Sequence, residues 1–270
     1  MSMMTVSRET GSLGDETARL LAEKLQYTLL DRTTMERTID DDTFPDIPLD
    51  RFDEHSPSFW ENFTTGKDVY LDRLRTAILE SSSADRAVIL GRGGQFILDG
   101  VPGVFKVRLI ASTEVRVARL TEFLQCDEKT AERYCRRSDH DRNGFSRFFF
   151  GGHWNEPSTY DITLCTDNLD AQTASDILRD AYHASPASRE SGGIVLKNRL
   201  MAQIVRNRIL YKDKIPVDLL EVEADDGHVT IRGTVTVREN AHRCEEAARN
   251  VEGVQLVDTE VYFVNPVMTY

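Results

Sequence analysis

The sequence predicts an α/β protein with two domains: a larger domain on a parallel sheet and a smaller α+β domain. Short apolar runs alternate with segments of helical period through residue 183, the pattern of a parallel sheet with crossover helices. The stretch Ala184–Gly193 is rich in small residues with Pro and Gly, which is typical of a domain boundary. We therefore expect domains over 1–183 and 194–270, joined by a linker over 184–193.

The first expected elements are a strand, a helix and a second strand. The apolar run Met3–Ser7 predicts the first strand, and a glycine-containing loop follows it. Over 17–25 the apolar residues recur with helical spacing, at Ala18, Leu21, Ala22 and Leu25. The segment Tyr27–Leu30 predicts a short strand that ends at Asp31.

An acidic, proline-bearing region separates this unit from the next helix. Residues 40–66 show few periodic features and predict a long loop with short helices, in which Asp40-Asp41-Asp42 is a solvated run rather than a metal site. The segment "DVYLDRLRTAILESSS" is amphipathic, with Val69, Leu74 and Ile78 on one face, and predicts a helix.

The rest of the larger domain continues the alternation. "RAVILGRGG" and "VFKVRLIAS" are buried strands by composition. "STEVRVARLTEFL" reads as a helix capped by Ser112 or Thr113, with Glu114 in its first turn. The charged stretch Cys126–Arg147 has helical period, "YDITLCT" is a last strand, and "LDAQTASDILRDAYH" is a closing helix.

Beyond the linker the pattern is helix, strand, strand, helix, strand, which is an αββαβ unit. A basic amphipathic helix spans 194–215, and two half-buried strands flank the turn Asp225-Asp226-Gly227. A helix over Arg238–Val251 and a strand over Gln255–Val264 complete the unit. The helix could expose its charges to a membrane surface, or pack Leu196, Leu200 and Ile204 on its own sheet.

Composition limits the classes of partner. The 270 residues carry a net charge of -12, which argues against broad binding to nucleic acid or anionic membranes but leaves room for a local basic site. The four cysteines show no metal-ligand spacing and are expected as reduced thiols. The N-terminus resembles no leader and no segment has the length of a membrane span, so we expect a cytoplasmic protein.

The loop "VSRETGSLGDET" resembles a phosphate-binding loop without its main charge. Successive backbone N–H groups and a helix N-terminus bind phosphate in such loops, a lysine neutralises it, and a Ser/Thr hydroxyl holds Mg²⁺. When the pattern G-x-x-x-x-G-K-[ST] is set on Gly14, Glu9 takes the place of the first glycine and Asp15 that of the lysine. An ordinary strand-turn-helix, with Ser12 as cap, explains the same residues.

Wider context connects this loop to a family. Several motifs occur in the order found in the cytidylate-kinase-like family, and they cover nearly all of residues 3–183. They are "SRETGSLGDETARLLAEKLQYTLLDR", "FDEHSPSFW", "VILGRGGQFIL" and "RRSDHDRNGFSRFFFGGHWNEPSTYDITLCTDNL". The resemblance implies a P-loop NTPase-type three-layer domain of the nucleoside monophosphate kinase type, with ATP and Mg²⁺ as cofactors.

The resemblance also implies site residues. The phosphate loop would bind nucleotide through Arg8, Gly11, Ser12, Gly14 and Thr17. Asp31 and Thr33 match the start of the monophosphate pocket, and Arg92 matches the arginine that faces the monophosphate. In the lid, Arg136, Asp139 and Arg142 match the family's pattern, and Arg147 adds a further cation. Mg²⁺ would arrive with ATP and be held by Ser12 or Thr17, and no separate metal site is expected.

The charge-rich lid admits other interpretations. Phosphoryl transfer needs positive groups around the transferred oxygens, and Arg136 and Arg142 could share that task only if the chain turned near Asn143-Gly144. Asp139 would then orient an arginine rather than act as a base. The same stretch could be a solvated helix, or its arginines and "FSRFFF" aromatics could stack on RNA.

The C-terminal unit resembles a BON domain, which is associated with phospholipid surfaces or partner binding. The motifs are "LKNRLMAQIV", "VEADDGHVTIRGTV" and "ARNVEGVQLVDTEV". Two functions follow as expectations. The first is phosphoryl transfer from ATP-Mg²⁺ to a cytidine-type nucleoside monophosphate or a related acceptor. The second is a catalytically inactive nucleotide sensor or scaffold that acts through the BON-like domain, with no nucleic acid partner and an open oligomeric state.

Overall fold

The computed structural model describes residues 3–38, 44, 66–83, 86–189 and 192–265. The Asp40-Asp41-Asp42 run, the "FDEHSPSFW" motif and the loop expected over 40–66, except for Phe44 and Gly66, lie outside the described residues.

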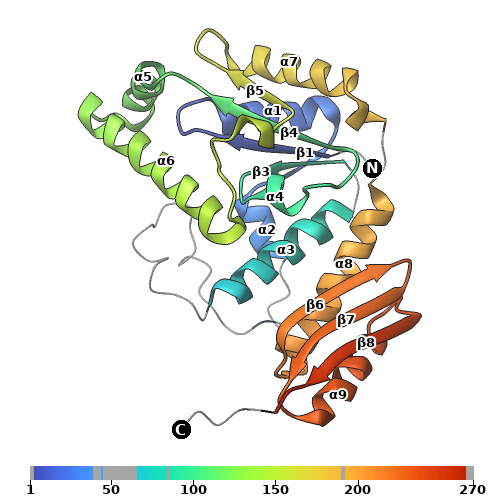
Figure 1. The fold of residues 1–270 in the computed structure, drawn as a ribbon. Coiled ribbons are helices and arrows are strands. Elements are labelled where there is room, and N and C mark those ends of the chain that lie inside the picture. The colour runs from blue at the N-terminus through green and yellow to red at the C-terminus, as the bar shows by residue number, and fades with distance from the viewer. Residues whose placement is uncertain (1–2, 39–43, 45–65, 84–85, 190–191, 266–270) are drawn as a thin grey trace.

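A five-stranded parallel sheet organises the larger domain and confirms the predicted fold class (Figure 1). Its strands are β1 (Met3–Arg8), β2 (Thr28–Leu30), β3 (Ala87–Leu90), β4 (Val104–Ile110) and β5 (Ile162–Cys165), in the order β2-β3-β1-β4-β5. Val6 pairs with Leu90 of β3 and Val107 of β4. The loops that leave β1, β3 and β4 therefore begin at the same edge of the sheet.

Helices cover both faces of this sheet and make the three layers. They are α1 (Gly14–Leu25), α2 (Arg32–Thr38), α3 (Lys67–Ser83), α4 (Gly94–Ile97), α5 (Thr113–Leu124), α6 (Glu128–Phe150) and α7 (Ala171–Ala184). Side chains of a strand alternate between faces, so Met4 and Val6 pack with α1 and α7 while Met3 packs with α3 and the end of α6. Ser112 caps α5, as one of the two expected residues.

Helix α6 confirms the helical period predicted over Cys126–Arg147 and runs without interruption through Asn143-Gly144. The turn that Arg136 and Arg142 would need in order to share one task does not form. Phe145 and Phe149 are one helical turn apart and share a face, and both are buried in the core of the larger domain. These rings are thus part of the packing rather than of a stacking surface for RNA.

The smaller domain has the predicted αββαβ order. Its elements are α8 (Gly193–Asn207), a π-helical turn η5 (Arg208–Lys212), β6 (Asp218–Asp225), β7 (His228–Val235), α9 (Arg238–Arg249) and β8 (Leu256–Phe263). Strand β7 is central, antiparallel to β6 and parallel to β8. One face of the sheet packs on α8 and α9, and the other carries Arg232 between Glu223 and Glu260.

Helix α8 belongs to both domains, which corrects the expectation that its apolar face packs only on its own sheet. Leu196 is fully buried in the core of the larger domain and Leu200 packs against that core, whereas Ile204 is exposed. Met201 and Val205 instead pack on the smaller sheet. Figure 1 shows α8 running from the larger domain to the smaller sheet. Because two faces of one helix are apolar, the helix joins the domains.

A buried carboxylate stabilises this joint, the contact between α3 and the segment formed by α8 and η5. Asp72 of α3, only 2% exposed, accepts hydrogen bonds from Gln203 at 3.1 Å, from Arg206 Nε at 3.1 Å and from the Tyr211 hydroxyl at 2.7 Å. Burial raises the pKa of Tyr211, and the neighbouring Asp72 charge raises it further, so this hydroxyl remains a donor. Arg206 and Arg199 of the basic helix thus serve contacts inside the protein.

Within the described part of the chain, no helix combines the length and the apolar character that crossing a bilayer requires.

Candidate functional site

The loop between β1 and α1 has the backbone of an anion-binding turn. Gly11 has a φ of +83°, and Leu13 reaches φ 60° immediately before α1 begins at Gly14. Ser12, expected as a helix cap, instead donates its hydroxyl to the Glu9 carbonyl at 2.8 Å. The N-terminal amides of α1 therefore have no side-chain cap, and free amides at a helix N-terminus attract anions.

Arg8 lies beside Asp15, the residue that stands at the lysine position of the phosphate-loop pattern. Its Nε is 3.0 Å from Asp15 Oδ1, and its stem crosses Gly14 so closely that a Cβ there would lie 2.3 Å from the Arg8 Cβ. Gly14 is thus needed for the path of Arg8 as well as for the turn. Arg19, a second basic residue near the loop, instead pairs with Glu23 at 2.6 Å. The structure therefore brings Arg8, and not Arg19, to the start of α1.

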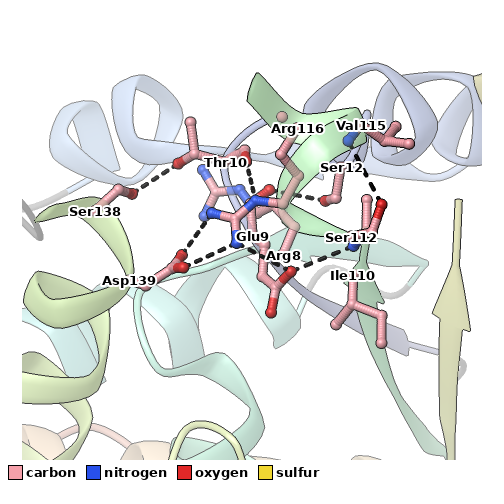
Figure 2. A network of polar contacts seen from close by, with 12 residues as sticks. Arg8, Glu9, Thr10, Ser12, Ile110, Ser112, Val115, Arg116, Ser138 and Asp139 are labelled. Carbon is pink, nitrogen blue, oxygen red and sulfur yellow. Dashed lines mark hydrogen bonds and ion pairs between the residues drawn. The ribbon is translucent and has the colours of Figure 1, made fainter. Parts of the chain in front are cut away.

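Glu9 is the centre of a polar network beneath the loop (Figure 2). Its carboxylate accepts hydrogen bonds from Arg108 of β4 at 3.1 Å and from Arg116 of α5 at 3.3 Å. Arg116 also donates to the Thr10 carbonyl at 2.7 Å. Glu9 thus replaces the first glycine of the phosphate-loop pattern with an anchor that fixes the loop to two neighbouring elements.

The same network attaches α6 to the loop. Asp139 accepts two hydrogen bonds from the Arg116 guanidinium, each 2.8 Å, and the hydroxyls of Thr10 and Ser138 are 2.7 Å apart (Figure 2). Burial lowers the pKa of Arg116, but the hydrogen bonds and charges of Asp139 and Glu9 outweigh this effect and raise it. Asp139 therefore orients an arginine, which is Arg116.

Three arginines from three elements line one pocket at the carboxyl edge of the sheet. They are Arg8 at the end of β1, Arg92 in the turn after β3, and Arg142 on α6. Arg92 and Arg142 are each 7% exposed. Arg142 donates to the Arg8 carbonyl at 2.5 Å, and Arg92 donates to the Tyr70 hydroxyl at 3.1 Å. The pocket has a volume of about 10 Å³, which is room for about one water molecule. These guanidinium groups would therefore have to move apart before a phosphate could lie between them, where paired N–H donors suit such an anion.

The turn that presents Arg92 leaves no room for a side chain at position 93. A Cβ at Gly93 would lie 2.2 Å from the Phe150 ring. Phe150 stacks on Phe96 of α4 with ring centroids 5.1 Å apart. The end of α6 therefore occupies the space that a side chain at position 93 would need.

Polar and aromatic groups complete the floor of the pocket. The Trp154 indole donates to the Ser7 hydroxyl at 2.7 Å, and both residues line the pocket. Arg108 lies over the Trp154 ring at 4.2 Å. Trp154 packs in this way, as expected, whereas the neighbouring His153 is exposed.

Several predicted site residues lie elsewhere. Asp31 caps α2 by accepting hydrogen bonds from the Thr34 amide and hydroxyl, both at 2.9 Å, and Thr33 is exposed. Arg136 is 75% exposed and pairs with Glu132, and Arg147 is also exposed. On an uninterrupted helix these two arginines cannot share the pocket with Arg142.

Sequence reasoning missed the roles of Glu9, Arg108 and Arg116. The sequence contains one indication of this network. Arg108 is a charged residue inside a largely apolar strand, and a buried charge requires a partner. The candidate partner was Glu9, one residue beyond the neighbouring strand.

The loop offers one side-chain oxygen that fits a magnesium-bound nucleotide. Thr17 is fully buried, and its hydroxyl has no hydrogen-bond partner among the residues that the structure describes. The described ranges contain no group of three His, Cys, Asp or Glu side chains arranged to hold a metal ion. Magnesium would therefore be carried mainly by the phosphates of its nucleotide.

Comparisons with known families agree with this geometry. A model described as the cytidylate kinase-like family matches residues 3–168, and a BON domain model matches residues 199–264. Among curated proteins, no relative matches the chain.

Solved structures share the fold of the larger domain. An uncharacterized protein from Eubacterium ventriosum is 20% identical, with a TM-score of 0.54, over 68% of this chain and 100% of that one. Shikimate kinase from Bacteroides thetaiotaomicron is 14% identical, with a TM-score of 0.42, over 67% and 98% of the two chains. The first of these likenesses supports the fold alone.

Proposed function

The chain belongs to the cytidylate kinase-like family, and on this premise we propose that its larger domain transfers a phosphoryl group from ATP-Mg²⁺ to a cytidine-type nucleoside monophosphate or a related phosphate-bearing acceptor. The observation that carries the proposal is the convergence of Arg8, Arg92 and Arg142 in one pocket beside the phosphate loop.

Each group has a task that its position suits. The uncapped amides of α1 and the turn at Gly11 bind the donor phosphates. Arg92 binds the acceptor phosphate, while Arg8 and Arg142 lie between this pocket and the loop, where charge develops during transfer. Magnesium supplies charge neutralisation when bound, and the Thr17 hydroxyl is the side-chain oxygen available to it.

A second function is favoured by Asp15. This carboxylate occupies the lysine position and neutralises Arg8 by an ion pair of 3.0 Å, which lowers the positive potential available for transfer. The alternative is therefore a nucleotide sensor or scaffold that binds without turnover and signals through its BON domain.

The BON domain would contact a protein partner or a phospholipid surface. Arg206 of its basic helix is engaged by Asp72, and the open sheet face carries Glu223 and Glu260. This charge distribution favours a protein partner over an anionic lipid surface. We place the protein in the cytoplasm and expect no nucleic acid partner.

Calorimetry with CMP and with ATP-Mg²⁺, followed by a transfer assay on a panel of monophosphates, tests the proposal. We expect CMP affinity to fall about tenfold to a hundredfold in Arg92→Gln and in Arg142→Gln, because each loses a charge-assisted hydrogen bond. Arg133→Gln, an exposed arginine on the same helix, is the control and should bind CMP like the wild type.

The transfer assay separates the two functions. Turnover by the wild type supports the enzyme, whereas binding without turnover that Asp15→Lys restores supports the sensor. If no nucleotide binds to the wild type, both functions are wrong.

A further inference from the structure

A second cationic recess lies at the joint between the two domains, apart from the pocket of Arg92. The groove has a volume of about 620 Å³ and is bounded by α3, the end of α4, α8 and the edge strand β6. This volume lies in the range of small-molecule sites. Its walls carry the guanidinium groups of Arg75, Arg199 and Arg206 beside the apolar side chains of Leu79, Ile97 and Leu220.

Two of these arginines donate no hydrogen bond to a carboxylate within the described ranges, although Asp99 lies near Arg199: the Lys106 hydrogen bond and, to a lesser degree, the Arg199 charge lower the pKa of Asp99. Arg206 takes both oxygens of Asp72 at 3.1 Å, so Arg75 approaches the same carboxylate only to 3.9 Å. Arg199 donates to the backbone carbonyls of Ile97 at 3.1 Å and Asp99 at 2.7 Å, and it makes no ion pair with any side chain that the structure describes. Burial lowers the pKa of Arg75. The Asp72 charge raises this pKa and the Arg206 charge lowers it, and the net shift is downward.

The wall of the groove formed by β6 carries glutamates instead of arginines. Glu221 and Glu223 of β6 line it, but Glu223 is neutralised by Arg232 at 2.6 Å. Glu221 lies directly across from Arg232 on β7, so both glutamates belong to the sheet face that Arg232 occupies. A ligand that fits the groove needs an anionic group for the arginines and an apolar body beside Leu79, Ile97 and Leu220.

We propose that this interdomain groove binds a small organic phosphate with a ring-shaped body, with the phosphate on Arg75 and Arg199 and the ring beside the apolar side chains of the groove. A guanidinium binds phosphate through paired N–H donors. This site goes beyond the proposed function, because its residues are not those of the Arg92 pocket.

Such a ligand would bridge the domains. It would contact α3, which carries Tyr70 and thus the hydrogen bond to Arg92, and also α8 and β6 of the smaller domain. A ligand that contacts both sides of a joint stabilises the joined state, and its binding is linked reciprocally to binding at the other site.

Calorimetry on the full chain with CMP, AMP and inorganic phosphate separates the two sites. Arg92→Gln removes the main pocket, and we expect this variant to keep one binding site for CMP or AMP. Arg75→Gln in that background should weaken the remaining site at least about tenfold, because a charged hydrogen bond is lost. Arg249→Gln, an exposed arginine of α9, is the matched control.

Hydrogen exchange gives an independent result. In the Arg92→Gln protein, CMP or AMP should protect amides in residues 71–79 and 199–206. Arg75 donates no hydrogen bond within the described ranges, so Arg75→Gln should melt within a few degrees of the wild type. The proposal is overturned if Arg92→Gln binds none of the three probes, or if Arg75→Gln leaves the remaining affinity unchanged. Failure of the proposed function would instead show as equal binding by the wild type and Arg92→Gln.

Discussion

Residue 93 shows how one side chain decides what the pocket can contain. Gly93 has a φ of +71° and lies under the Phe150 ring. No side chain could be added here without moving the end of α6. The aromatic packing of α6 therefore requires glycine at this position.

Gly93→Ala should destabilise the protein strongly. The left-handed backbone costs about 1–2 kcal/mol for a residue with a Cβ, and overpacking adds about 1–3 kcal/mol. We expect the free energy of unfolding in urea to fall by about 2–5 kcal/mol.

Gly144→Ala provides the matched control. Gly144 lies in the interior of α6, and a Cβ there would meet nothing within 4 Å. Its replacement should raise the free energy of unfolding by about 0.5–1 kcal/mol. Equal effects of the two substitutions would contradict the packing described around Phe150.

At the scale of elements, α6 is attached to the β1–α1 loop, as the proposed function requires of a lid. Arg116 binds Asp139 with two hydrogen bonds of 2.8 Å, and this contact lies one helical turn from Arg142 in the pocket. Asp139 is thus a positioning residue for Arg142.

Asp139→Asn should loosen the lid without unfolding the domain. We expect CMP affinity to fall about tenfold, since one charged hydrogen bond is worth about 1.5 kcal/mol. Amides over 136–146 should exchange faster in hydrogen-exchange measurements, which a purely electrostatic effect on the ligand would not produce. Asp180→Asn, an exposed aspartate of α7, should leave both quantities unchanged.

The elements were largely predictable from periodicity, and the connections between them were not. Apolar runs predicted all five parallel strands, because buried strands must be apolar on both faces. The helical period over Cys126–Arg147 was also confirmed, but the turn that would let Arg136 and Arg142 act together does not form. Phe145 and Phe149, which share the buried face, keep the helix continuous there.

For the site, sequence predicted the pocket arginines Arg8, Arg92 and Arg142 but not the network that positions them. Resemblance identifies residues that face a ligand. Glu9 and Arg116 meet through the fold, from segments more than 100 positions apart, and no local spacing reveals such a pair. Arg136 was grouped with Arg142 by sequence proximity, but it points to solvent from another side of the helix.

At the scale of the whole molecule, α8 joins the two domains. Gly192, just before this helix, packs closely, since a Cβ there would lie 2.3 Å from the Pro102 carbonyl oxygen. Leu196 completes the core of the larger domain, and Asp72 receives Gln203, Arg206 and Tyr211. The smaller domain is therefore held in one orientation against α3.

Asp72→Ala tests this joint. Removing one partner of a buried ion pair costs about 3–5 kcal/mol, because Arg206 is left buried without its carboxylate. We expect the single urea transition of the wild type to separate into two as the domains uncouple. Asp180→Ala is the control, and an unchanged single transition in Asp72→Ala would show that the joint does not depend on this carboxylate.

The central claim is that Arg8, Arg92 and Arg142 form a phosphate pocket beside the loop of Gly11 and Gly14. A crystal structure of the full chain with CMP tests it most directly. The account predicts the phosphate oxygens within about 3 Å of guanidinium nitrogens of these arginines. A nucleotide bound elsewhere, with the three arginines left out of contact, would contradict it.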